Sequence, residues 1–450
     1  MVFFEDYKNP ERIRHAVNIM LNMGRGIDIL LAKDDPERLF VVKPNWIQDA
    51  HEYKDHVWEP VITHPELILC VLQCLAERIQ GRATICVCDA PHTYADFAAI
   101  VKRGEFQQRF EALTEKFPSI KFEVLDLRRE VWTRKEEVVV ERCRNPDDPR
   151  GYVKVDLGSD SLFYGHVGEG RFYGADYDST VVNSHHRGKI QEYLIAGTPI
   201  SCDLFINLPK MKTHKKTGIT CCLKNLVGIN GDKNWLPHYT EGGPVRGGDE
   251  FPEYSFLNRF ESNVKKIGRK MALKIPGLGT WLYRKMRHLG KQCLGDSGVV
   301  IRNGNWSGND TCWRMVLDLN RALLYANTDG TWRDRFQPKA YLAIVDGVIG
   351  GQGDGPLCPD PVQSNVLVSG TNPAEVDAVV AKLMGFAPNK LPVIKNAFEP
   401  HRWPIATGKM EDIKVFDGRA GHEVGLSEVR SAVEGGLTPH FGWKNLQDEE

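Results

Sequence analysis

Side chains that could bind and activate an anionic molecule are concentrated between residues 202 and 233. The segment KMKTHKK holds five cationic or imidazole side chains and no acid; they are Lys210, Lys212, His214, Lys215 and Lys216. Such groups repel one another, and a fold tolerates them most easily around a bound anion. The run joins an apolar segment, Leu204–Leu208, to a predicted helix at 219–226 that carries Lys224 and Asn225. We therefore favour an anion site over the alternative, a solvated basic turn.

Polar side chains also follow three other predicted strands. Lys43 and Asn45 follow the strand 39–42, Asp89 and His92 follow the strand 83–89, and Asp346 follows the strand 340–345. Ligands of an open parallel sheet bind beyond the carboxyl ends of its strands, so we expect these groups to converge. The predicted substrate-binding residues are Lys43, Asn45, Lys210, Lys215, Lys224, Asn225, Gly351 and Gly353. The two glycines belong to a predicted loop after Asp346, where backbone amides can approach a ligand closely.

Three of these residues are candidates for chemistry. Lys212 or His214, with its pKa lowered by neighbouring cations, is the expected general base, and Asp346 completes the predicted catalytic set. Asp346, Asp377 and a histidine could bind a divalent metal ion. Asp377 lies in the first turn of a helix that Asn372 and Pro373 are expected to begin, so an interaction with the helix dipole explains it equally well. No spacing in this set identifies a reaction.

The pattern around these residues predicts a single large α/β domain over residues 1–450, with a mostly parallel sheet covered by helices. His64 and Pro65 are expected to begin a helix that ends near Arg78, between two buried strands. Residues 245–335 are predicted to form a mostly helical insertion. Within it, residues 263–295 combine basic and apolar side chains without an acid. We favour a helical hairpin packed on the main domain; contact with an anionic membrane surface is the alternative.

Composition limits the classes of function. The chain has 450 residues and a net charge of −1, which argues against a generally basic nucleic-acid-binding protein. No apolar run is long enough to span a membrane, and the N-terminus lacks a signal peptide's apolar core. We therefore expect a cytoplasmic protein, which could contact the membrane surface through residues 263–295. Eleven cysteines include no Cys-x-x-Cys pair. An iron–sulfur cluster within this chain is therefore not expected.

Three sequence blocks resemble the DUF362 family, a group without an assigned function. They are VVKPNW with THPELI, NLPKMKTH with TGITCCLKNLVG, and IVDGVIGGQGDGP with SGTNPAEVDAVVAKLMG, which together span most of the chain between residues 41 and 398. The resemblance implies one α/β domain of catalytic appearance but no reaction. Some members carry ferredoxin-type cysteine clusters, and this chain departs from them in that respect.

These observations lead to one functional expectation and two alternatives. We expect an enzyme that binds a phosphorylated or carboxylated small molecule, such as a sugar or a lipid-linked glycan precursor, with a divalent metal as an optional cofactor. The first alternative is a redox protein coupled to an iron–sulfur partner, which the ferredoxin-fused relatives suggest. The second is a module that senses an anion without catalysis.

Overall fold

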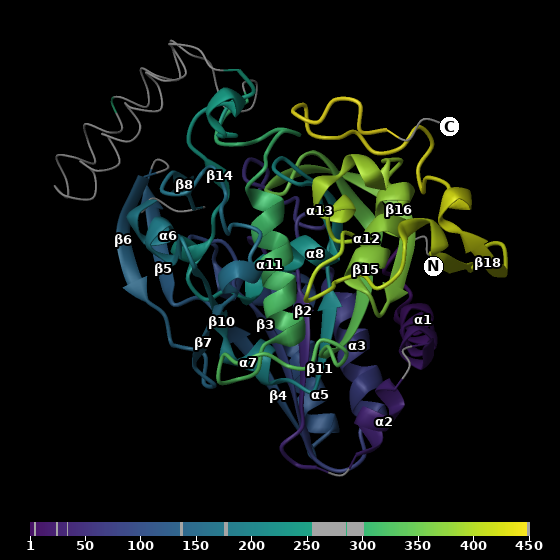
Figure 1. Ribbon diagram of the computed structural model, residues 1–450. Coiled ribbons are helices and arrows are strands. Elements are labelled where there is room, and N and C mark those ends of the chain that lie inside the picture. Colours follow the sequence, from purple (N-terminus) through teal and green to yellow (C-terminus); the bar gives the residue numbers. More distant parts are fainter. Residues whose placement is uncertain are drawn as a thin grey trace.

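The computed structural model describes residues 1–3, 6–23, 26–33, 35–135, 138–174, 179–253, 285 and 301–447. Within these residues the chain forms a nine-stranded sheet with helices on both faces (Figure 1). The segment 263–295, predicted as a helical hairpin with membrane contact as the alternative, lies outside the described residues apart from Lys285. The predicted α/β class with a mostly parallel, helix-covered sheet is confirmed.

The strands are β1 (Val2–Phe3), β2 (Leu39–Pro44), β3 (Ala83–Asp89), β4 (Ile120–Asp126), β5 (Glu130–Lys135), β6 (Val138–Arg144), β7 (Tyr152–Asp156), β8 (Phe172–Tyr173), β9 (His186–Arg187), β10 (Ile190–Ala196), β11 (Leu204–Leu208), β12 (Lys210–His214), β13 (Gly218–Thr220), β14 (Tyr239–Thr240), β15 (Ala340–Asp354), β16 (Cys358–Gly370), β17 (Lys414–Asp417) and β18 (His422–Gly425). The helices are α1 (Pro10–Met23), α2 (Ile27–Ala32), α3 (Pro65–Arg78), α4 (Phe97–Lys102), α5 (Phe106–Lys116), α6 (Ser179–His185), α7 (Gly197–Ser201), α8 (Cys222–Asn225), α11 (Cys312–Tyr325), α12 (Pro373–Leu383) and α13 (Pro392–Lys395).

The central sheet has the order β1-β16-β15-β11-β2-β3-β4, with β12 added to β15 and β13 added to β12. The pairs from β15 through β11, β2 and β3 to β4 are all parallel, whereas β16 and β1 extend the sheet in antiparallel fashion. Parallel strands end on the same edge of a sheet. The carboxyl ends of β2, β3 and β11 therefore lie side by side, as the strand-end prediction requires.

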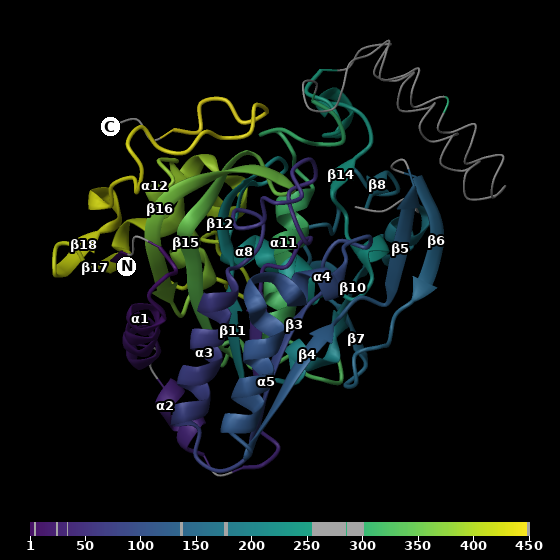
Figure 2. The ribbon, with the colours of Figure 1, turned by 180° about the vertical axis from the view of Figure 1, so that it is seen from behind.

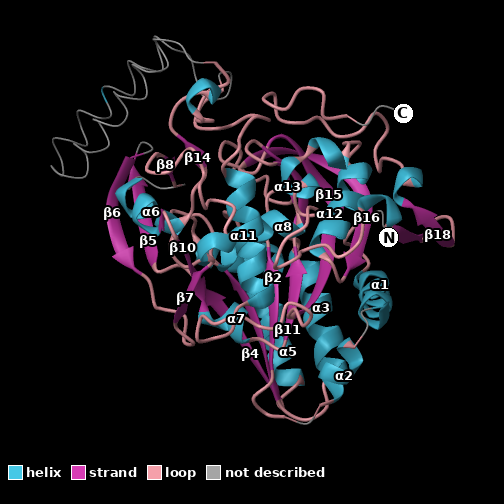
Figure 3. Cartoon of the chain, in the orientation of Figure 1, coloured by secondary structure: helices cyan, strands magenta, loops and turns pink. Residues whose placement is uncertain are grey.

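Each central strand is apolar on both faces, which is why the sheet is buried between two helical layers. In β2, Val41 belongs to one hydrophobic cluster, while Phe40 and Val42 belong to the other. Helices α11 and α12 pack on the first face (Figure 1), and α3 and α5 pack on the second (Figure 2). Figure 3 shows the helices of the first face, α11 and α12, in front of the strands of the central sheet.

The helix predicted to start at His64-Pro65 is α3, and it ends at Arg78 as expected. His64 is its N-cap, because its Nδ1 accepts a hydrogen bond from the Glu66 backbone N–H at 3.1 Å. The predicted helix at 219–226 is shorter than expected. Residues 218–220 form β13, because they pair with β12, and α8 begins only at Cys222.

Two further segments differ from their predictions. The glycine-rich segment after Asp346 is part of strand β15, which stays paired with β16 as far as Asp354, with one register shift between Gly347 and Ile349. Helix α11 falls inside the predicted insertion, 245–335, yet its buried side chains belong to the main hydrophobic core. On the buried side of α11, Asp318 and Arg321 form an ion pair within the helix, with Oδ1 and Nη1 3.4 Å apart.

Candidate functional site

Strand β12 brings three of the predicted site residues onto one face. Lys210, Lys212 and His214 alternate along the strand, so their side chains leave it on the same side. Because β12 pairs in parallel with β15, Lys210 lies opposite Asp346 and Lys212 lies opposite Gly351. All three side chains are buried.

Asp346 is fully occupied by structural partners. Its Oδ2 lies 3.0 Å from Lys210 Nζ and accepts the His64 backbone N–H at 2.7 Å, while Oδ1 accepts the Tyr7 hydroxyl. Burial, followed by the charge of Asp346, raises the pKa of Tyr7 well above its usual value, so the phenol keeps its proton. Both oxygens are thus bonded to described residues and the side chain has no exposed surface, so the contacts that the structure shows for Asp346 are structural ones.

Lys43 is held in a second buried ion pair. Its Nζ lies 2.8 Å from Asp89 Oδ1 and 2.7 Å from the Pro44 carbonyl oxygen. The other carboxylate oxygen, Asp89 Oδ2, accepts the Trp46 backbone N–H at 2.7 Å. Gly228 packs directly over the pair, because a Cβ at that position would lie 2.0 Å from Asp89 Oδ1.

Asparagine side chains connect the ends of β2 and β11 to helix α8. Asn225 Oδ1 accepts hydrogen bonds from Asn45 Nδ2 at 2.8 Å and from Lys43 Nζ at 3.3 Å. Asn225 Nδ2 donates to Asn207 Oδ1 at 2.7 Å, and Asn207 Nδ2 donates to the Tyr341 hydroxyl at 2.8 Å. The network fixes α8 against the strand ends, and it joins three of the predicted residues, Lys43, Asn45 and Asn225.

Four lysines of the central stretch have no carboxylate within ion-pair distance among the described residues; they are Lys212, Lys215, Lys216 and Lys224. Lys212 Nζ donates to the Val61 carbonyl oxygen, and Lys216 Nζ donates to that of Asn303. Burial lowers the pKa of Lys212 well below its usual value, and it lowers the pKa of Lys224 as well. The pKa of Lys216 falls to about 8 for the same reason.

His214 shapes the turn between β12 and β13. Its Nδ1 accepts the backbone N–H groups of Lys216 at 3.0 Å and Thr217 at 3.3 Å. Burial is the largest cause that lowers the pKa of His214 well below its usual value, followed by the charges of Lys224 and other cations. The imidazole is therefore neutral near pH 7.

His238 joins this cluster, although its sequence neighbourhood gave no reason to select it. Its Nδ1 lies 2.9 Å from the Leu236 carbonyl oxygen, and its backbone is held by Tyr173 and Asn309 on either side. Burial, followed by the charge of Lys224, lowers the pKa of His238 well below its usual value. Lys224 thus acts electrostatically on both imidazoles.

The two predicted glycines have structural explanations in β15. Gly351 lies opposite Lys212, and a Cβ there would be 2.9 Å from Lys212 Cβ. Gly353 has a φ of 74° and donates its backbone N–H to the Thr438 carbonyl oxygen at 2.8 Å. The amide of Gly353 is therefore already bonded within the protein, and both glycines serve strand packing.

The carboxylates predicted to share a metal ion have separate partners. Asp377 Oδ1 accepts the Cys222 N–H at 2.7 Å and Oδ2 accepts the Leu223 N–H at 3.0 Å, so Asp377 caps α8. Burial raises the pKa of Asp377 to about 6. Asp377 lies with the thiols of Cys221 and Cys222, all within 4.8 Å of one another, and Asp346 is not part of this group.

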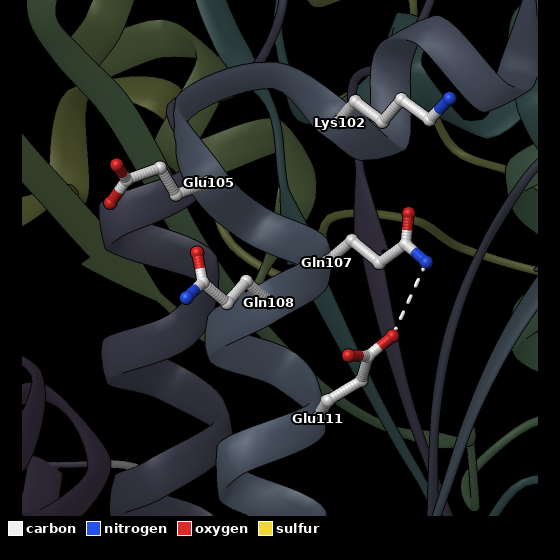
Figure 4. A pocket seen from close by; sticks show the side chains of 5 residues that line it. All are labelled: Lys102, Glu105, Gln107, Gln108 and Glu111. Atoms are coloured by element: carbon white, nitrogen blue, oxygen red, sulfur yellow. Dashed lines mark hydrogen bonds between the residues drawn. The ribbon is translucent and has the colours of Figure 1, made fainter.

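A surface hollow of about 280 Å³ lies away from these residues. Figure 4 shows its lining, which comes from α4, α5 and the turn between them: Lys102, Glu105, Gln107, Gln108 and Glu111. Gln107 Nε2 donates to Glu111 Oε1 at 3.2 Å, an ordinary contact one helical turn apart. None of the predicted site residues lines this hollow, and we assign it no function.

The sheet and its strand-end cluster define a helix-covered α/β protein with buried cations at the carboxyl edge of its parallel strands. The model of the family described as "Domain of unknown function (DUF362)" matches residues 124–382, more than half of the 450-residue chain. The chain therefore belongs to the DUF362 family. The match includes β11, β12, α8 and Asp346, the elements that carry most of the cluster.

The other comparisons add no function. The curated proteins include no significant match. A solved structure, that of a protein from Thermotoga maritima, is similar with 10% sequence identity and a TM-score of 0.34 over 82% of this chain. This chain spans 57% of the length of that protein, and a likeness so distant carries no argument. Among the described helices, none combines the length and apolar character needed to cross a bilayer.

Proposed function

We propose that the protein is an enzyme that binds a phosphorylated or carboxylated small molecule at the carboxyl ends of its parallel strands. The cluster that binds the anion consists of Lys212, Lys216 and Lys224 with His214 and His238. Cations and imidazoles of this kind bind phosphate and carboxylate oxygens through charge-assisted hydrogen bonds.

One contrast between the lysines carries the proposal. Lys43 and Lys210 are neutralised by Asp89 and Asp346 at 2.8 Å and 3.0 Å, whereas Lys212 and Lys224 have no ion pair among the described residues. Among the described residues, carboxylates thus neutralise Lys43 and Lys210 but not Lys212 and Lys224. Ammonium groups withdrawn from water without a counter-charge are unfavourable, so a bound anion is the simplest compensation.

The proposed ligand is limited to what the described residues can support. The expectation of a lipid-linked substrate rested on residues 263–295, which lie outside them, so the proposal is confined to an anionic small molecule. The two carboxylates predicted to hold a metal are bonded elsewhere, so the cations and imidazoles carry the proposal alone.

Calorimetric titration with inorganic phosphate tests the proposal. The wild-type protein is expected to bind one phosphate per chain. Lys224→Met is expected to weaken binding by about tenfold or more, because a hydrogen bond to a charged group contributes roughly 1.5–3 kcal/mol. Lys409→Met is the matched control, since Lys409 is 76% exposed and loses the same charge.

Two results would contradict the proposal. One is the absence of phosphate binding by the wild-type protein at millimolar concentration. The other is an equal loss of affinity in Lys224→Met and Lys409→Met, which would indicate a general effect of net charge instead of a site.

A further inference from the structure

His214 and His238 are held in opposite tautomers by their backbone partners. The groups that contact His214 Nδ1 are backbone N–H donors of Lys216 and Thr217, so Nδ1 accepts and the proton of the neutral ring is on Nε2. The group that contacts His238 Nδ1 is the carbonyl oxygen of Leu236, so Nδ1 carries the proton and Nε2 has a free lone pair.

The Nε2 atoms of both rings remain available for a ligand. Neither has a hydrogen-bond partner in the part of the chain that the structure describes. The two residues retain 5% and 8% of their accessible surface, so they are nearly buried without being sealed. Lys216 connects the two rings, because its backbone N–H donates to His214 Nδ1 at 3.0 Å and its Nζ lies 5.1 Å from the ring centroid of Tyr239, the residue next to His238. The charges of Lys224 and Lys216 also lower the pKa of both rings.

We infer that His214 and His238 form a donor–acceptor pair for one bound molecule, which carries a hydroxyl group beside its anionic group. His214 donates its Nε2–H to an anionic oxygen. His238 accepts the hydroxyl hydrogen with its Nε2 lone pair. This inference rests on the proposed function, because it assumes an anion among the cations of the cluster.

The pair also defines a proton transfer. When the hydroxyl proton moves to His238 Nε2, the ring becomes an imidazolium that still donates its Nδ1–H to the Leu236 carbonyl oxygen. The electron pair of the broken O–H bond stays on the substrate oxygen, beside the ammonium of Lys224. His238 is thus the proton acceptor, and His214 positions the anionic group; the sequence had predicted His214 or Lys212 as the base.

Phosphate and sulfate distinguish the two roles without knowledge of the natural ligand. At pH 8 monohydrogen phosphate and sulfate have the same charge and nearly the same shape, but only phosphate carries a hydroxyl. Sulfate has no hydrogen to donate, so one of its oxygen lone pairs would face the Nε2 lone pair of His238. A buried polar group without a hydrogen-bond partner costs about 1–3 kcal/mol of binding free energy. We therefore expect phosphate to bind at least about fivefold more tightly than sulfate in the wild-type protein.

Two asparagine variants separate the rings. His238→Asn keeps an amide N–H for the Leu236 carbonyl oxygen and removes Nε2, so the preference for phosphate should fall to about threefold or less. His214→Asn keeps an acceptor for the Lys216 and Thr217 N–H groups and removes the Nε2 donor. Both anions should then bind more weakly by a similar factor, and the preference should remain.

Nitrogen-15 NMR of histidine-labelled protein measures the tautomers directly, and the same two variants assign the signals. The expected result is a protonated Nε2 in His214 and a protonated Nδ1 with a bare Nε2 in His238. A protonated Nε2 in His238, equal affinity for the two anions, or an unchanged preference in His238→Asn would overturn the inference. If neither anion binds, the proposed function fails, and the NMR tautomers still decide whether the pair exists.

Discussion

Lys210 and Asp346 lie opposite each other on the parallel strands β12 and β15, with Nζ and Oδ2 3.0 Å apart and both side chains fully buried. Tyr7 and the backbone of His64 complete the environment of the carboxylate. The pair joins the N-terminal segment, α3, β12 and β15 at one point. We conclude that it organises the strand ends beside Lys212 and Lys224, which form no ion pair with any described residue.

The first prediction concerns this pair. Asp346→Asn leaves the Lys210 ammonium buried without a counter-charge, and we expect the free energy of unfolding to fall by about 3–5 kcal/mol. Urea denaturation of the purified variant measures the loss. Asp360→Asn is the control, because its partnership with Lys54 is exposed and should contribute less than about 1 kcal/mol. Equal stability of Asp346→Asn and wild type would contradict a structural role.

A second prediction separates binding from stability at Lys224. Burial lowers the pKa of Lys224, so the charged side chain is unfavourable in the ligand-free fold. Lys224→Met should therefore leave the ligand-free protein equally stable or more stable, by up to about 1 kcal/mol, while phosphate no longer raises its Tm. Thermal unfolding with and without phosphate tests both parts. A large loss of stability without phosphate would show that Lys224 has a structural partner.

The third prediction concerns the space beside Lys43 and Asp89. In Gly228→Ala the new methyl group would lie 2.0 Å from Asp89 Oδ1 and 2.6 Å from Lys43 Nζ, so the ion pair must separate. We expect a loss of more than about 3 kcal/mol in the free energy of unfolding. Gly408→Ala is the matched control, since nothing lies within 4 Å of its new Cβ. Similar stability of the two variants would refute the close packing of Gly228.

The fourth prediction is a loss of stability in acid that depends on His186. Burial lowers the pKa of this fully buried ring from 6.5 to about 4. Between these values the unfolded chain binds the proton and the folded chain does not, so folding becomes less favourable as the pH falls. A pKa difference of one unit between the folded and unfolded states corresponds to about 1.36 kcal/mol. His186 should therefore lower the free energy of unfolding by about 2–3 kcal/mol between pH 6.5 and pH 4.5.

Urea denaturation at those two pH values measures this effect. In His186→Gln the loss between pH 6.5 and pH 4.5 should be smaller than in wild type by about that amount, because one depressed titration is removed. His422→Gln is a suitable control, since that ring is exposed. The same pH dependence in His186→Gln and wild type would refute the assignment.

The sequence predicted the sheet and the strand-end convergence because both depend on local patterns. Buried apolar runs that end in Lys43, Asp89 or Lys210 report the ends of parallel strands, and the fold brings those ends together. These predictions needed no knowledge of distant partners.

The sequence could not predict which residues of the cluster form ion pairs with one another and which are left for a ligand. Lys210 and Asp346 are 136 residues apart, so nothing local shows that they neutralise each other while Lys212 meets no carboxylate in the part of the chain that the structure describes. In the sequence, the glycines after Asp346 resemble a ligand-binding loop. The close contacts that explain them, such as that of Gly351 with Lys212, form only when the strands pair, so the sequence does not reveal them. His238 stands in an apolar segment and gains its role from Lys224 and Leu236.

A crystal structure of the protein soaked in phosphate tests the central claim most directly. We expect one anion with an oxygen within hydrogen-bond distance of Lys224 Nζ and another within that distance of His214 Nε2. Phosphate bound only at other places, or no anion beside Lys224 at a concentration that saturates binding in solution, would contradict the claim.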